Sequence, residues 1–131
     1  MTCRELYEAA LRLVCENADH GDVSDYEDRA GYILATAVTQ CAPLDVAYRK
    51  ANGLPTSTPF AGVWIDLEED FPLCDIFSPA VLHYLCAMLV LDENERLSDK
   101  LFELYADEMA TIQSSFPAKN GKTLDHYGLL K

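Results

Sequence analysis

The feature that most constrains the fold of this 131-residue chain is an apolar run at residues 80–91, which only His83 interrupts. The run is too short to cross a membrane, because a spanning helix needs about 20 apolar residues. Ser78 and Pro79, directly before it, are typical of a helix start. A helix that is apolar nearly all round must be buried, so we expect the rest of the chain to pack around it.

Three other segments have the spacing of amphipathic helices. Capping boxes that begin at Thr2 and Ser24 predict the starts of the first two. Residues 92–95 are expected to turn the chain and cap a last helix that runs to about Ser115, with Glu108 on its flank reaching water. The apolar positions are Cys3, Leu6, Ala10, Leu13 and Val14 in the first helix, Tyr26, Ala30, Ile33, Leu34, Ala37 and Cys41 in the second, and Leu97, Leu101, Leu104, Tyr105, Met109, Ile112 and Phe116 in the last.

Proline and glycine indicate where the second helix stops. Pro43 is expected to end or kink it at Ala42, because proline disfavours helix at the preceding residue. Residues 44–52 could then add a short helical piece, stopped by Gly53.

Residues 53–77 are rich in proline and cannot form a long helix, although residues 63–67 could form one short strand. A connection of this length tends to be functional or mobile in a compact domain. We therefore predict an all-α fold, a compact bundle of four to five helices with a long central loop. Residues 1–116 would form one domain, and residues 117–131 a loose C-terminal tail.

The charge of the chain is strongly negative and unevenly distributed. There are 22 acidic residues against 10 Lys and Arg, a net charge of −12. Residues 66–108 hold twelve acids and two bases, whereas residues 119–131 hold three lysines and Asp125. This balance argues against a protein that binds nucleic-acid phosphates as its main activity. Five scattered cysteines fit a reducing cytoplasm better than a disulfide framework.

The sequence contains no pattern typical of catalysis, metal binding or cofactor binding. His83 and Cys86 are three residues apart, but a zinc site needs about four converging ligands and no second pair exists. Nucleophile elbows and phosphate-binding glycine loops are also absent from the sequence. We therefore expect no enzyme activity, no catalytic residue, no metal, no cofactor, no small-molecule substrate and no membrane segment.

Four large apolar residues in the long loop, Phe60, Val63, Trp64 and Ile65, are candidates for protein contact. They could fold back over the helical core, or they could pack into a neighbouring chain. Trp64 is the best anchor, because aromatic side chains dominate interface energetics.

Glu68, Glu69 and Asp70 follow this group and form a candidate acidic face. General acid–base catalysis needs a desolvated carboxyl group with a shifted pKa. Three consecutive acids in a loop are expected to lie in water, so we interpret them as surface charge.

The elements of residues 64–112 occur in a distinctive order. They are an acidic stretch that ends in Phe-Pro-Leu (64–73, WIDLEEDFPL), an apolar helix (80–89, AVLHYLCAML), an acidic turn (91–95, LDENE) and a final amphipathic helix (97–105, LSDKLFELY). In this order the chain resembles the small head–tail connector (neck or adaptor) proteins of tailed bacteriophages and their prophages. It departs from some connectors in having no clear hairpin at residues 60–65.

The resemblance implies a structural role in virion assembly. Such a subunit would form a ring-shaped homo-oligomer below the portal and would contact neighbouring phage head and tail proteins. It would be made in the bacterial cytoplasm and then join the virion. A ring of this kind needs two different, complementary surfaces on each subunit. Acidic walls would let DNA pass without specific binding.

Two other functions fit parts of the sequence. An acidic helical protein could mimic DNA and bind a nuclease or regulator, if its carboxylates form a phosphate-like row on one face. A small enzyme would need a deep pocket with converging polar groups.

Overall fold

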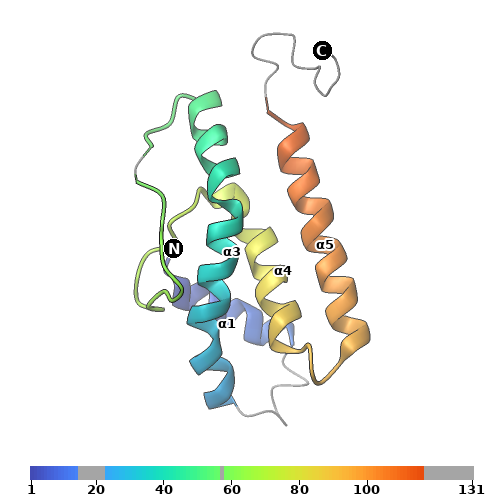
Figure 1. The fold of residues 1–131 in the computed structure, drawn as a ribbon. Helices are drawn as coiled ribbons and strands as arrows, with labels where there is room; N and C mark the ends of the chain where they lie inside the picture. Colours follow the sequence, from blue (N-terminus) through green and yellow to red (C-terminus); the bar gives the residue numbers. More distant parts are fainter. Residues whose placement is uncertain (15–22, 57, 117–131) are drawn as a thin grey trace.

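The computed structural model describes residues 1–14, 23–56 and 58–116, and Figure 1 shows their arrangement. The helices are α1 (Cys3–Leu13), α3 (Val23–Ala51), α4 (Ser78–Leu89) and α5 (Glu95–Ser114), with a short 3₁₀ turn, η1 (Asp75–Phe77), before α4. The predicted all-α bundle is confirmed. The short strand that residues 63–67 could have formed is absent, and the described residues contain no sheet.

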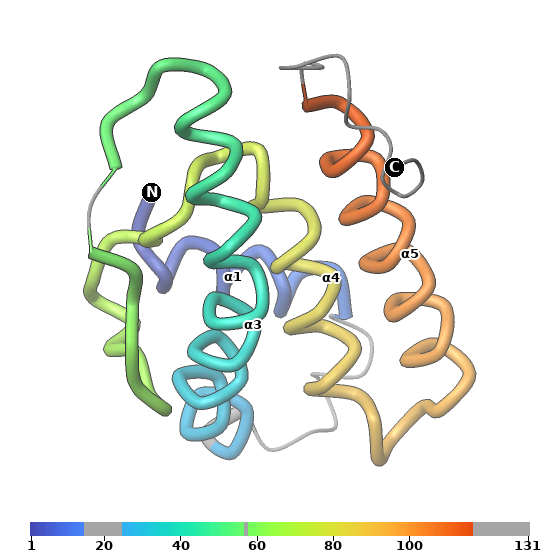
Figure 2. The backbone as a smooth tube through the Cα atoms, turned by 45° about the horizontal axis from the view of Figure 1, so that its top comes forward, coloured from blue at the N-terminus to red at the C-terminus, as the bar shows by residue number. Residues whose placement is uncertain are grey.

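Helix α4 lies at the centre of the bundle, as its composition predicted. It lies between α3 and α5 while α1 crosses behind it, and it contacts all three helices (Figures 1 and 2). Burial of its apolar surface supplies much of the favourable free energy of folding. The largest fully buried side chains are Tyr7, Tyr26, Phe77, Leu34, Leu85 and Leu89.

Local capping fixes the start of two helices. Thr2 Oγ1 accepts a hydrogen bond from the backbone N–H of Glu5, and Glu5 Oε1 accepts one from that of Thr2. The predicted capping box of α1 is therefore confirmed. Asn94 caps α5 by accepting from the N–H of Leu97. The side chain of Ser24, predicted to cap the second helix, lies outside the described residues.

Of the end or kink predicted at Pro43, the end does not occur, because α3 runs through Pro43 to Ala51. Proline removes only the hydrogen bond to the carbonyl of Thr39, which lies on an exposed part of the helix where water can replace it. Cys41 and Ala42 before Pro43 and Asp45 after it are buried, so tertiary contacts hold both halves of α3 in place. The predicted stop at Gly53 is confirmed by its left-handed φ of 67°.

Three side chains lie differently from their predicted positions. Leu13 and Leu104 were expected on buried faces but are exposed, because each lies at the edge of its apolar stripe. Glu108 does not simply extend into water, since its Oε1 lies 2.8 Å from Nδ1 of the half-buried His83.

Candidate functional site

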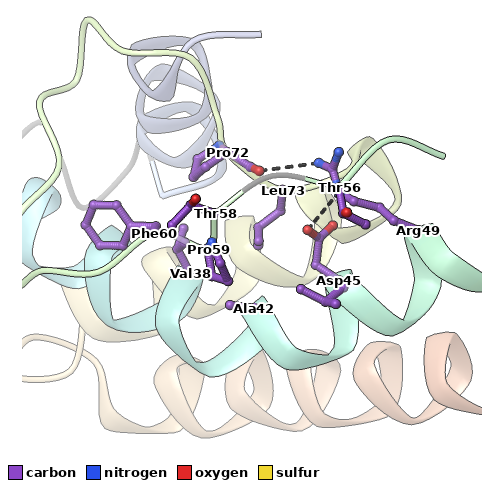
Figure 3. A pocket seen from close by; sticks show the side chains of 11 residues that line it. Val38, Ala42, Asp45, Arg49, Thr56, Thr58, Pro59, Phe60, Pro72 and Leu73 are labelled. Carbon is purple, nitrogen blue, oxygen red and sulfur yellow. Dashed lines mark hydrogen bonds and ion pairs between the residues drawn. The ribbon is translucent and has the colours of Figure 1, made fainter.

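Both ends of the long loop are joined to one turn of α3 by Asp45 and Arg49. Asp45 is only 6% exposed, and its two oxygens accept hydrogen bonds from Arg49 Nε and the backbone N–H of Cys74, each at 2.9 Å. Arg49 also donates to the carbonyl of Pro55, at 3.0 Å, and to that of Pro72, at 3.4 Å; Figure 3 shows the contact with Pro72. The pair therefore acts as a clamp on the start and the end of the loop.

A cavity of about 270 Å³ lies beside this clamp, between α3 and the loop (Figure 3). Its walls include Val38, Phe60 and Leu73. The only charged groups among its lining residues are Asp45 and Arg49, which are already paired with each other and with the backbone. A buried pair satisfied in this way serves to hold the loop in place.

The middle of the loop lies directly on α3 at Gly31. The backbone N–H of Ile65 donates to the carbonyl of Gly31 at 3.1 Å, and the Ile65 side chain is buried. A Cβ atom at Gly31 would lie 2.5 Å from Nε1 of Trp64 and 2.7 Å from the Ile65 carbonyl. Only glycine allows the indole ring and the loop backbone to approach the helix this closely.

The chain's first residues attach to the loop at a third place. The N–H groups of Cys3 and Arg4 donate to the carbonyls of Glu69 and Leu67 at 2.9 and 2.7 Å. These contacts, together with those at Gly31 and the Asp45–Arg49 clamp, fix the course of the loop along α3. Residues that point outward from it are therefore held in a defined position.

Two of those residues form an exposed apolar surface with α3. Val63 is 78% exposed and Trp64 52%, and Tyr32 of α3 is 57% exposed. A hollow of about 430 Å³ next to Trp64 and Tyr32 is also lined by Asp28 and Asp66. We call these five residues, Asp28, Tyr32, Val63, Trp64 and Asp66, the Trp64 face.

The four candidate contact residues thus separate into three environments. Val63 and Trp64 point outward, Ile65 belongs to the core, and Phe60 is half-buried beside the clamp cavity. Sequence reasoning did not include Tyr32 in this group. The only pattern that could have identified Tyr32 as a contact residue is its position: it is an aromatic residue outside the apolar stripe of its helix, one turn after Asp28.

The charge of the Trp64 face is negative. Arg4 beside it is paired with Glu68 and, at 3.3 Å, with Glu27, and these hydrogen bonds raise the pKa of Arg4. Within the described part of the chain, no ion pair involves Asp28 or Asp66. The hollow therefore presents carboxylates beside an aromatic ring, which is a favourable environment for a cation.

Glu68, Glu69 and Asp70, the candidate acidic face, are exposed beside the N-terminus of α1. The positive end of the helix dipole favours carboxylates there. The pKa of the Cys3 thiol rises to about 11, first because the thiol is buried and then because Glu69 and Asp70 are near. The negative charge of these three residues therefore complements the N-terminus of α1.

A second acidic area lies on α5, on the other side of the bundle from the long loop (Figures 1 and 2). From Glu95 to Asp107 every fourth residue of this helix is an exposed acid: Glu95, Asp99, Glu103 and Asp107. Successive members are about 6 Å apart along the axis. The acids of residues 66–108 therefore do not share one face.

No group of three His, Cys, Asp or Glu among the described residues could hold a metal ion. None of the helices described is long and apolar enough to cross a membrane. Comparisons with protein-family models, curated proteins and solved structures find no match to this chain.

Proposed function

We propose that this protein is a structural assembly subunit that joins copies of itself and neighbouring proteins, as a head–tail connector of a tailed bacteriophage does. Under this proposal the chain acts through its surfaces rather than by catalysis. It would be made in the bacterial cytoplasm and incorporated into the virion at the portal.

The observation that carries this proposal is the outward position of Val63 and Trp64 on a loop fixed to α3. An exposed tryptophan costs solvation free energy that burial against a partner would recover. A loop already fixed before binding loses little conformational entropy on association. Aromatic anchors held in this way are typical of the residues that dominate interface energetics.

The test is to measure the mass of the 131-residue chain by light scattering over a wide concentration range, alone and with a purified phage portal complex. We expect concentration-dependent association, portal binding, or both. Trp64→Ala should weaken this association at least about tenfold, as loss of an interface anchor does. The variant should keep cooperative unfolding, because Trp64 is half-exposed and Ile65 supplies the buried contact.

Leu91→Ser is the matched control, since it removes an exposed apolar side chain elsewhere on the surface. It should leave association unchanged. The proposal would be contradicted by a wild-type protein that stays monomeric at high concentration and ignores portal and tail proteins. Loss of cooperative unfolding in Trp64→Ala would instead assign the indole to the core.

The acidic row on α5 favours a second candidate function, that of a DNA mimic that binds a nuclease or regulator. Its regular spacing along an exposed helix gives carboxylates in a line, although Arg96 and Lys100 lie beside it. The test is competition with double-stranded DNA for a basic nuclease. Glu103→Lys should abolish inhibition if this function is correct, and Trp64→Ala should not affect it.

A further inference from the structure

We propose that the Trp64 face binds residues 117–131 of a second copy of this chain. This inference rests on the proposed assembly function and deepens it, because it assigns both partners of the contact between subunits. One partner is the described surface of α3 and the loop, and the other is known by its sequence.

The two partners have opposite charge and matching apolar groups. The hollow beside Trp64 is lined by three carboxylates, those of Glu27, Asp28 and Asp66, against the single guanidinium of Arg4, which is paired with Glu27. Residues 117–131 carry three lysines and one acid, and four large apolar residues. They are Lys119, Lys122, Lys131 and Asp125, with Leu124, Tyr127, Leu129 and Leu130.

The chemistry of the face suits a lysine-bearing peptide. An ammonium group over the indole of Trp64 or the ring of Tyr32 gains cation–π attraction, and Asp28 and Asp66 add opposite charge within the same hollow. The apolar side chains of the segment can cover Val63, which is the most exposed large apolar residue of the face.

The described arginines near the face are already engaged. Arg29 pairs with Asp25 and donates to the Met88 carbonyl, and Arg49 belongs to the loop clamp. Residues 119–131 combine a net charge of +2 with a group of apolar side chains. Residues 46–65 carry the same net charge, but Arg49 of that segment is engaged in the loop clamp. Residues 119–131 are therefore the segment of a second copy that best complements this face.

Chain length argues that Lys119 and Lys122, the two lysines that the test below replaces, reach this face from a second copy and not from the same one. Phe116 packs against Tyr48 with ring centroids 6.0 Å apart, and Asp28 precedes Tyr48 by 20 residues of α3, or about 30 Å. Lys119 and Lys122 are three and six residues beyond Phe116. Even fully extended, they reach only about 11 and 22 Å from it.

The contact would be heterologous, since two different surfaces of each subunit meet. The loop carrying the Trp64 face lies along the lower half of α3 in Figure 1, whereas α5 ends at the top of the bundle, near the C-terminal end of α3. Repetition of such a contact closes into a ring or continues as a filament, depending on the rotation between subunits.

Trp64 is the only tryptophan in the chain, so its fluorescence reports on this face alone. The experiment titrates a synthetic peptide of residues 117–131 into the 131-residue chain carrying Lys119→Glu and Lys122→Glu. We expect a saturable change in Trp64 emission. The affinity for the peptide obtained from it should fall about tenfold or more between about 0.05 M and 0.5 M salt. A peptide with both lysines replaced by glutamate should cause no change.

Two receptor variants of equal charge change locate the binding site. Asp28→Lys should weaken peptide binding at least about tenfold, whereas Asp107→Lys, on α5, should change it less than about twofold. Equal effects of the two variants would mean attraction by overall charge and would overturn the inference. Circular dichroism on both variants checks that they remain folded.

Self-association of the 131-residue chain separates this inference from the proposed function. Combining Asp28→Lys with Lys119→Glu and Lys122→Glu should restore association that either change alone removes. Association that depends on Trp64 but ignores the peptide and these charges would overturn the inference and leave the assembly function standing. Peptide binding by a protein that never associates with itself or with portal would overturn both, because no second copy would then occupy the face.

Discussion

At the scale of single residues, the exposed position of Trp64 depends on Gly31. Replacing a helical glycine with alanine normally stabilises a helix by about 1 kcal/mol. At Gly31 the new Cβ would meet the indole and the Ile65 carbonyl at 2.7 Å or less. We predict that Gly31→Ala instead lowers the free energy of unfolding by about 1–3 kcal/mol, as overpacking does, and shifts Trp64 emission.

Thr39→Ala is the control for this prediction. It improves helix propensity at an exposed position of the same helix, so urea unfolding should show a small gain in stability and unchanged Trp64 emission. If Gly31→Ala stabilised the protein as Thr39→Ala does, the close approach of the loop to α3 would be wrong.

At the scale of elements, α5 carries an arrangement that its own stability does not favour. Glu95, Asp99, Glu103 and Asp107 are like charges at i,i+4 spacing, which destabilises a helix by about 0.2–0.5 kcal/mol per pair. Asp99→Lys would replace two repulsive pairs with attractive ones. We predict a gain of about 0.5–1 kcal/mol at low salt.

The gain should shrink as salt is raised, because exposed charges are screened. Thermal unfolding of Asp99→Lys and of Asp99→Asn at two salt concentrations would measure this effect, with the asparagine variant gaining about half as much. A salt-independent gain would have another origin, such as helix propensity.

The elements also divide into those that local sequence predicts and those that it does not. Thr2 with Glu5, and Gly53, were predictable because each acts on backbone groups within a few residues. Continuation of α3 through Pro43 was not, because contacts from elsewhere in the chain outweigh one lost hydrogen bond. The same holds for the site. Val63 and Trp64 could be named as candidates from the loop sequence. Gly31 and Tyr32 lie about 30 residues earlier in the chain, and the spacing of residues in α3 does not indicate that they lie beside the loop.

At the scale of the whole molecule, the thiols buried between helices link stability to pH. Cys3, Cys41 and Cys86 are free, and burial raises their pKa values from 9.0 to about 11, 11 and 12. Their shared environment is the core that α4 forms with α1, α3 and α5. A thiol whose pKa is higher in the folded state keeps its proton after the unfolded chain has released it.

The sign of this linkage predicts alkaline unfolding. Below pH 9 all three thiols are protonated in both states and their contribution to stability is complete. Between pH 9 and about 11 or 12 the unfolded chain loses protons first, so the free energy of unfolding falls as pH rises. Cys86 alone would contribute a slope of up to about 1.4 kcal/mol per pH unit in this window.

Urea unfolding measured from pH 8 to 11 tests the slope. Cys86→Ala should reduce it, whereas Val81→Ala, an equally buried change without a titrating group, should lower stability and leave the slope intact.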